Sequence, residues 1–152
     1  MKEIKGDLWE FYGKEGFAVL ITTNGFVRKD GKAVMGRGCA RQAVSKISSD
    51  LPELLGDAIK KYGNVLLRPF GADDAYPECQ VLTFPVKHNW WEMANLKLIR
   101  KSALALKKLA RKSPEYIFVL PRPGCGNGQL LWGNVKPLLT DLPDNVLVIH
   151  KR

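Results

Sequence analysis

The chain alternates between apolar runs and amphipathic stretches. Runs rich in β-branched residues predict strands buried on both faces of a sheet, and they cover residues 17–23, 116–120 and 145–151. Further strands are expected at 1–5, 64–70 and 79–86, with a loop at 71–77. Helices are expected at 39–48, Leu51–Tyr62, 92–112 and 131–139, and a helical turn at 7–12. This alternation predicts a three-layer α/β/α fold with a mostly parallel, mixed central sheet, and we expect residues 1–152 to form a single domain.

Local signals mark where several of these elements begin and end. Asp7 and Asp50 are candidate N-caps, because a short side-chain oxygen accepts bonds from the free N–H groups of a first helical turn. Gly63 and the Ser113-Pro114 pair are expected to stop the helices before them, and Pro137 to kink or end the 131–139 helix. The 92–112 segment is the clearest helix, with an apolar stripe of Leu96, Ile99, Ala103, Leu106 and Ala110.

Two glycine-rich segments each follow a predicted strand and lead into a predicted helix. The first consists of Val34, Met35, Gly36, Arg37, Gly38 and Cys39, and the second of Pro123, Gly124, Cys125, Gly126, Asn127, Gly128, Gln129 and Leu130. Glycine lets backbone N–H groups approach a ligand, and a helix N-terminus adds partial positive charge. Ligands of parallel α/β folds bind beyond the carboxyl ends of the strands. We therefore expect a cleft for a ligand with two phosphates.

Each segment also has a simpler interpretation. The first alone fits a turn with a solvated arginine, and the second a loose connection between strand and helix. The spacing of the second does not match the Walker motif, which ends in Gly-Lys-Ser/Thr, and matches the dinucleotide fingerprint poorly.

Three polar residues at predicted element ends are candidates for chemistry. Asn24 follows a buried strand and could hydrogen-bond a ribose hydroxyl. Asp7 could accept a bond from an adenine amino group, or serve only as a helix cap. Lys87 precedes Trp90 and Trp91, and a lysine near a sugar can act as an amine nucleophile; a surface lysine beside two core tryptophans is the simpler alternative.

Composition narrows the class of protein. Lys and Arg number 24 against 15 Asp and Glu, a net charge of +9 that favours anionic partners. Much of the excess positive charge lies between residues 97 and 112, which form either a solvated face or a nucleic-acid contact.

The three dispersed cysteines, Cys39, Cys79 and Cys125, argue against a disulfide framework or zinc site. We expect no metal and no cofactor. Without an apolar run long enough for a membrane span or a secretion signal, we expect a cytoplasmic protein. We also expect a monomer.

The sequence resembles macrodomains, α/β modules that bind ADP-ribose. The resemblance extends over nearly the whole chain and is most specific in Asn24 with residues 33–40, in residues 84–87 with Trp90, and in residues 124–130 with Trp132 and Val135. It is strongest for the branch that contains the terminal ADP-ribose protein glycohydrolase and the bacterial antitoxin that removes ADP-ribose from DNA.

The resemblance implies roles for individual residues. Asp7 would contact adenine, and Leu8 would be a binding residue beside it. The two glycine-rich segments would hold the diphosphate from opposite sides. Lys87 would lie near the distal ribose, as the catalytic lysine of the branch does. Two positions differ from the branch. Gly128 stands where the protein glycohydrolase has an aspartate, and Val86 where threonine is more usual. The Asn127-Gly128 pair is closer to the DNA-acting antitoxin, in keeping with the positive charge.

Four functions are compatible with these observations. The leading one is hydrolysis of terminal ADP-ribose from DNA or from protein carboxylates. The others are non-catalytic recognition of ADP-ribose, removal of the 1″-phosphate from ADP-ribose, and nucleic-acid binding through the basic 97–112 helix. The first three would use the same cleft, and the fourth would not need it.

Overall fold

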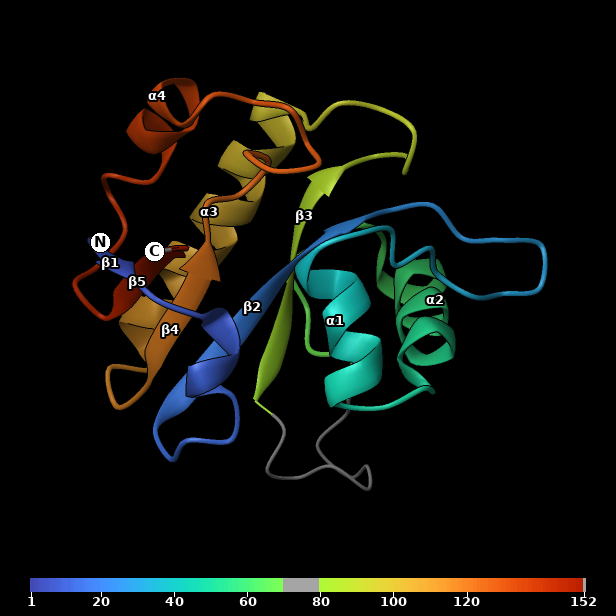
Figure 1. Ribbon diagram of the computed structural model, residues 1–152, viewed down its shortest axis with the longest axis horizontal. Helices are drawn as coiled ribbons and strands as arrows, with labels where there is room; N and C mark the ends of the chain where they lie inside the picture. The colour runs from blue at the N-terminus through green and yellow to red at the C-terminus, as the bar shows by residue number, and fades with distance from the viewer. Residues whose placement is uncertain (70–79, 152) are drawn as a thin grey trace.

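The computed structural model describes residues 1–69 and 80–151. Its strands form one sheet in the order β1-β5-β4-β2-β3 (Figure 1). Their bounds are β1 Lys2–Lys5, β2 Phe17–Asn24, β3 Val81–Lys87, β4 Ile117–Pro121 and β5 Val146–His150. All four pairings between these strands are parallel, so their carboxyl ends meet at one edge of the sheet.

Helices cover both faces of this sheet (Figure 1). One face carries α1 Cys39–Lys46 and α2 Leu51–Tyr62, together with the short 3₁₀ helix η1 Leu8–Phe11. The other carries α3 Leu96–Lys112, α4 Trp132–Val135 and the 3₁₀ helix η2 Lys136–Leu138. The predicted three-layer α/β/α architecture is therefore confirmed.

Successive side chains of each strand point to opposite faces of the sheet, as the two-residue period of a strand requires. In β2, Leu20 packs in the core on the α3 side with Phe84 and Leu106. The next residue, Ile21, packs with α2 on the opposite side. Both side chains are fully buried, and burial of a side chain of this size contributes about 1.5–3 kcal/mol.

The helix predicted at 92–112 begins four residues later, at Leu96. Asn95 is its N-cap, and the Asn95 side chain accepts a bond from the Leu98 N–H. The N–H of Asn95 itself donates to the carbonyl of Val86, and that of Ala94 to the carbonyl of Gly128. The segment before Leu96 is therefore tied to β3 and to the second glycine-rich segment. Leu96, predicted to be part of the apolar stripe, is 41% exposed.

The strand predicted at 64–70 is not formed by its described residues. Residues 64–69 run beside β3 without a regular ladder of backbone hydrogen bonds. Instead, Thr83 makes both bonds to Leu67: its Oγ1 accepts a bond from the Leu67 N–H, and its N–H donates to the Leu67 carbonyl. Asn64 likewise uses its side chain, donating from Nδ2 to the carbonyl of Lys87. The expected strand residues Phe70, Cys79 and the 71–77 loop lie outside the described residues.

Of the residues predicted to cap or stop helices, Asp50 is the one that does not act as predicted. Asp7 caps η1 through its side chain, and Gly63, with a φ of 89°, ends α2. Pro137 lies in η2, where α-helical geometry has already given way to 3₁₀. Asp50 makes no side-chain cap for α2, because its backbone is already helical and its N–H is bonded to Ser48 Oγ.

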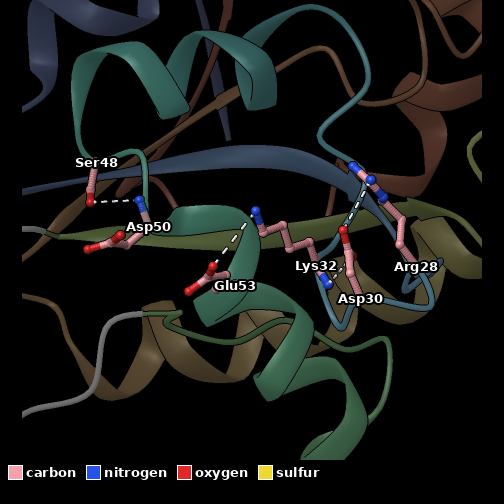
Figure 2. A network of polar contacts seen from close by, with 6 residues as sticks. All are labelled: Arg28, Asp30, Lys32, Ser48, Asp50 and Glu53. Carbon is pink, nitrogen blue, oxygen red and sulfur yellow. Dashed lines mark hydrogen bonds and ion pairs between the residues drawn. The ribbon is translucent and has the colours of Figure 1, made fainter.

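The loop that leads to the first glycine-rich segment is fastened to α2 (Figure 2). Lys32 Nζ lies 3.8 Å from Glu53 Oε1, and Asp30 Oδ1 accepts a bond from the Lys32 N–H. The Ala33 N–H donates to the carbonyl of Pro52 over 2.8 Å. Exposed ion pairs of this kind contribute about 0–1 kcal/mol each. A Cβ on Gly56 would overlap the Gly31 carbonyl, so glycine at position 56 allows this close approach.

Candidate ligand-binding cleft

A cleft of about 760 Å³ lies at the carboxyl ends of the strands. The ends of β1, β4 and β5 and the two glycine-rich segments surround it. Of the predicted binding residues, those that line it are Asp7, Leu8, Arg37, Gly38, Cys39, Gly124, Gly126, Asn127 and Gly128. The two segments face each other closely, since a Cβ built on Gly38 would lie 3.3 Å from Asn127 Nδ2.

The first segment opens directly into α1. Gly36 and Gly38 have φ angles of 59° and 72°, a left-handed conformation that favours glycine. Gly38 is the N-cap and provides no side-chain bond to the helix start. The first N–H groups of a helix have no partner within it. The Gly38 end of α1 therefore presents donors and partial positive charge to the cleft.

The second segment forms a tight turn with unpaired donors at its crest. Gly124 has a φ of 76°, and its carbonyl accepts a bond from the Leu130 N–H. Among the described residues, the N–H groups of Gly126, Asn127 and Gly128 donate to no other protein group. Consecutive free N–H groups form a nest suited to an anionic oxygen.

The glycines of the second segment serve two different purposes. A Cβ on Gly128 would lie 2.5 Å from the Gly124 carbonyl oxygen, and one on Gly124 would lie 2.9 Å from Ala94 Cβ. Glycine is required at both positions for the turn to pack against the residues before α3. A Cβ on Gly126 would meet nothing within 4 Å, so Gly126 instead keeps the cleft open.

Lys87 lies at the end of β3, beside the second segment, although it does not line the cleft itself. Its Nζ donates to the carbonyl of Asn127 over 3.3 Å and to that of Trp90 over 3.4 Å. The side chain is half-buried, while the preceding Val86 lines the cleft. The amine therefore lies at the edge of the cleft formed by β3 and the nest.

Several predicted binding residues support the cleft from behind. Asn24 is buried; its Nδ2 donates to the Val34 carbonyl over 2.8 Å and its Oδ1 accepts from the Phe26 N–H. Met35 packs in the core beside α1 and α2. These residues hold the first segment in place. The other predicted binding residues outside the lining are Val34, Gly36, Pro123, Cys125, Gln129 and Leu130.

Asp7 has one function that the structure shows directly. Its Oδ1 accepts a bond from the Trp9 N–H and caps η1. The exposed carboxylate also lines the cleft, at the end that η1 and α1 enclose. Capping therefore leaves the Asp7 carboxylate accessible to a ligand.

Sequence reasoning missed part of the lining. Arg122 follows β4, and His150 and Lys151 lie at the end of β5, all in the cleft wall. The rule that placed the glycine-rich segments at strand ends applies equally to these residues, so their positions were the signal that could have found them. The rest of the unpredicted lining consists of Gly6, Glu10, Thr22, Gln42, Val86, Pro121 and Ile149.

Glu3 holds Arg122 in this wall. Glu3 Oε1 lies 3.4 Å from Arg122 Nη2 and accepts a bond from Trp132 Nε1, while Lys136 Nζ lies 2.8 Å from Glu3 Oε2. The hydrogen bond from Lys136, its positive charge and the contacts with Trp132 and Arg122 lower the pKa of Glu3, against a smaller opposing effect of burial. The Arg122 guanidinium also lies 4.8 Å above the Trp132 ring.

Two cysteines lie at the glycine-rich segments. Cys39 Sγ is 3.4 Å from the N–H of Thr22, so it joins α1 to β2 in the cleft wall. Burial raises the pKa of the Cys125 thiol, opposed in part by the charge of Arg122. A neutral thiol beside the nest adds no negative charge to repel an anion.

Within residues 1–69 and 80–151, no group of His, Cys, Asp and Glu side chains is arranged to hold a metal ion. No helix in the same part of the chain has the length and apolar character needed to cross a membrane.

Comparison with solved structures identifies the fold. DarTG of Thermosipho africanus, solved in complex with ADP-ribose, superposes with a TM-score of 0.73 at 20% sequence identity, over 99% of this chain and 42% of that one. The macrodomain of Thermus aquaticus DarG superposes with a TM-score of 0.71 at 20% identity, over 99% of this chain and 97% of the other. The chain has the macrodomain fold.

A third structure agrees, the macrodomain of Mycobacterium tuberculosis DarG, with a TM-score of 0.70 at 23% identity over 97% and 95% of the two chains. No family model matches the sequence, and no curated protein matches it. In these superpositions the chain covers less than half of the Thermosipho protein but nearly all of the two DarG macrodomains.

Proposed function

We propose that this macrodomain binds ADP-ribose in the cleft and hydrolyses terminal ADP-ribose from modified DNA or from protein carboxylates. The observation that carries the proposal is the juxtaposition of the two glycine-rich segments. The start of α1 and the nest at Gly126, Asn127 and Gly128 present unpaired N–H groups from two sides of one cleft. A pyrophosphate carries anionic oxygens on two neighbouring phosphorus atoms and would satisfy both sets of donors.

The remaining contacts follow from the shape of the cleft. The end near η1 would take the adenine, with the Asp7 carboxylate accepting from its amino group and the buried Leu8 beneath it. The end near β3 would take the distal ribose, beside Lys87. Arg37, Arg122 and Lys151 surround the space between with positive charge, which suits a diphosphate.

Hydrolysis would break the bond between C1″ of the distal ribose and the acceptor, with water supplying the new hydroxyl and a proton leaving with the acceptor. Positive charge develops on the sugar in such a transition state, so correctly positioned groups determine the rate. Lys87 would act at this sugar, either by attacking C1″ or through its electrostatic field. Its bonds to the Asn127 and Trp90 carbonyls hold Nζ at that end of the cleft.

One experiment separates binding from turnover. Calorimetry with ADP-ribose tests the cleft, and incubation with ADP-ribosylated DNA and with glutamate-modified protein tests hydrolysis. We expect binding, turnover of at least one substrate, and loss of turnover in Lys87→Ala but not in Lys60→Ala, an exposed lysine of α2. Absence of ADP-ribose binding would overturn the proposal.

A nucleophilic role for Lys87 makes a further demand. Attack by the amine would give an imine with the ring-opened sugar, which borohydride would trap as a stable adduct on Lys87. Lys87→Arg keeps the positive charge but cannot form that adduct. Retention of turnover in Lys87→Arg, without an adduct in the wild type, would assign the electrostatic role.

Recognition of ADP-ribose without turnover is the second candidate. Gly128 favours it, because a carboxylate cannot be placed at this position without a clash between its Cβ and the Gly124 carbonyl. Tight ADP-ribose binding together with two inert substrates would select this function. Release of phosphate from ADP-ribose 1″-phosphate would instead indicate the related phosphatase activity.

The basic face of α3 is proposed as an additional nucleic-acid contact. Its exposed cations include Lys97, Arg100 and Lys101, near the end of α3 that adjoins the second segment. Binding through this face should weaken steeply with salt and should not depend on Gly126. Equal turnover of modified DNA and modified protein after these residues are neutralised would contradict it.

A further inference from the structure

Three aromatic side chains form an exposed cluster beside Lys87. The Phe26 and Trp91 rings lie 5.4 Å apart between centroids, and the Trp90 and Trp91 rings 5.6 Å apart, both edge to face. Trp90 is 51% exposed and Trp91 59% exposed. These two tryptophans were expected to be core residues if Lys87 had no special function, and they are not. Exposed tryptophans that contact one another are uncommon on a protein surface and indicate a binding site.

The backbone places this aromatic cluster at the edge of the cleft. The Trp90 carbonyl accepts a bond from Lys87 Nζ, and Lys87 also bonds to Asn127 in the nest. On the other side of the cluster, the Gly25 N–H donates to the carbonyl of Lys87 and fixes Phe26 next to the end of β3. The connection between β3 and α3 thus lies against the second glycine-rich segment (Figure 1).

The position of the cluster relates it to one part of a substrate. If the adenine end of the ligand lies near Asp7 and the distal ribose near Lys87, the group attached to C1″ leaves the cleft on the side of the aromatic cluster. This step rests on the proposed function, which sets the direction of the ligand.

The chemistry of the cluster favours a nucleobase over a carboxylate side chain. Aromatic rings stack on the face of any base, whereas they offer no hydrogen-bond donor to an aspartate or glutamate apart from the two indole N–H groups. Two exposed cations are close to the cluster along the chain, Lys29 three residues after Phe26 and Lys97 six residues after Trp91, and the chain carries a net charge of +9. Aromatic rings combined with positive charge are typical of surfaces that bind single-stranded nucleic acid.

We propose that Phe26, Trp90 and Trp91 form a stacking platform for an unpaired base of a single-stranded nucleic acid, at or next to the ADP-ribosylated nucleotide. The platform selects the acceptor, while the glycine-rich segments bind the ADP-ribose. A base in a duplex is stacked on its neighbours and is not available to the platform unless it is flipped out.

The test uses two double variants that differ in one property. Trp90→Leu with Trp91→Leu keeps apolar bulk but removes both aromatic faces, whereas Trp90→Phe with Trp91→Phe keeps a ring at each position. Each protein is titrated, in a Lys87→Ala background so that the modified ligands are not hydrolysed, with an ADP-ribosylated single-stranded oligonucleotide, with the unmodified oligonucleotide, with ADP-ribose and with an ADP-ribosylated glutamate peptide. Calorimetry gives the affinities, and quenching of tryptophan fluorescence in the wild type reports stacking directly.

The leucine pair should bind the modified oligonucleotide roughly 5- to 100-fold more weakly than the wild type, from the loss of stacking of one base. Its affinities for ADP-ribose and for the peptide should stay within about twofold of the wild type, given that these ligands do not need stacking. The phenylalanine pair should retain most of the oligonucleotide affinity. Unmodified single strands should quench the fluorescence of the wild type, and a matched duplex should do so much less.

Three results would overturn the platform: an unchanged oligonucleotide affinity in the leucine pair, an equal loss for oligonucleotide and peptide, or equal behaviour of the leucine and phenylalanine pairs. Failure of the wild type to bind ADP-ribose would overturn the proposed function instead. In that case quenching by the unmodified oligonucleotide, present in the wild type and absent in the leucine pair, would still support the platform, and its absence would refute it.

Discussion

Replacement of Gly126 by leucine is the most direct perturbation of the proposed cleft. A Cβ at this position meets nothing within 4 Å, and the backbone is not in the left-handed region that only glycine tolerates well. The fold should therefore accept the substitution. The added side chain would project from the crest of the nest into the space lined by Gly38 and Asn127.

The magnitude follows from the donors that the leucine would screen. Hydrogen bonds to charged groups contribute about 1.5–3 kcal/mol each. The nest offers three such donors, and loss of contact with one or two of them would cost about 3 kcal/mol, or more than a hundredfold in affinity. The free energy of unfolding should change by less than about 0.5 kcal/mol, because the site is exposed and uncrowded.

Calorimetric titration with ADP-ribose and thermal unfolding of the same samples would measure both quantities. Gly133→Leu is the matched control, since a Cβ there also meets nothing within 4 Å and Gly133 does not line the cleft. Wild-type affinity in Gly126→Leu, or an equal loss in Gly133→Leu, would refute the idea that main-chain donors of the nest hold the ligand.

Three further substitutions test the surrounding structure. Gly128→Ala should lower the free energy of unfolding by about 1–3 kcal/mol, because its Cβ would lie 2.5 Å from the Gly124 carbonyl oxygen; a melting temperature equal to that of Gly126→Ala would contradict this. Asn24→Ala leaves the Val34 carbonyl without its partner and should lower the free energy of unfolding by about 2 kcal/mol, which is a fall of about 5 °C in Tm by calorimetry. An unchanged Tm would show that the first glycine-rich segment does not depend on this bond. Since the folded state lowers the pKa of Glu3 below its ordinary value of 4.5, Glu3 stabilises the protein above that pH and loses this effect as the pH falls through the lowered pKa. Urea unfolding of wild type and Glu3→Gln should therefore differ most at pH 6–7 and converge toward about pH 3, and a constant difference would show that the charge of Glu3 is not responsible.

The elements themselves were largely predictable because their signals are local. The β-branched runs, the stop at Gly63 and the cap at Asp7 act within a few residues of the chain, and the structure confirms them. Two of the errors share one cause, which is bonding to distant residues. The segment 64–69 bonds through Leu67 to the side chain and N–H of Thr83 rather than through a regular strand ladder. The start of α3 is set by bonds from the Ala94 N–H to the Gly128 carbonyl and from the Asn95 N–H to the Val86 carbonyl.

The type of site could be predicted from the sequence, but the exact set of residues that line it could not. Both glycine-rich segments reach one cleft, yet Asn24 and Met35 face inward and support it, and Arg122 and His150 line it without having been expected. Whether a loop side chain points toward a cleft or into the core depends on what packs behind it. That information is absent from a short pattern of glycines.

The sequence alone determined that this is a mostly parallel α/β fold with two glycine-rich turns that follow strands, because periodicity and glycine act over a few residues. Only the tertiary structure decided that β2 lies between β4 and β3, which brings Gly38 to Asn127 and Lys87 to the nest. It also decided that Phe26 meets Trp91 at the surface rather than in the core. Strand order and side-chain direction are set by packing between residues far apart in the chain, and this packing exists only once the sheet and both helical layers have assembled.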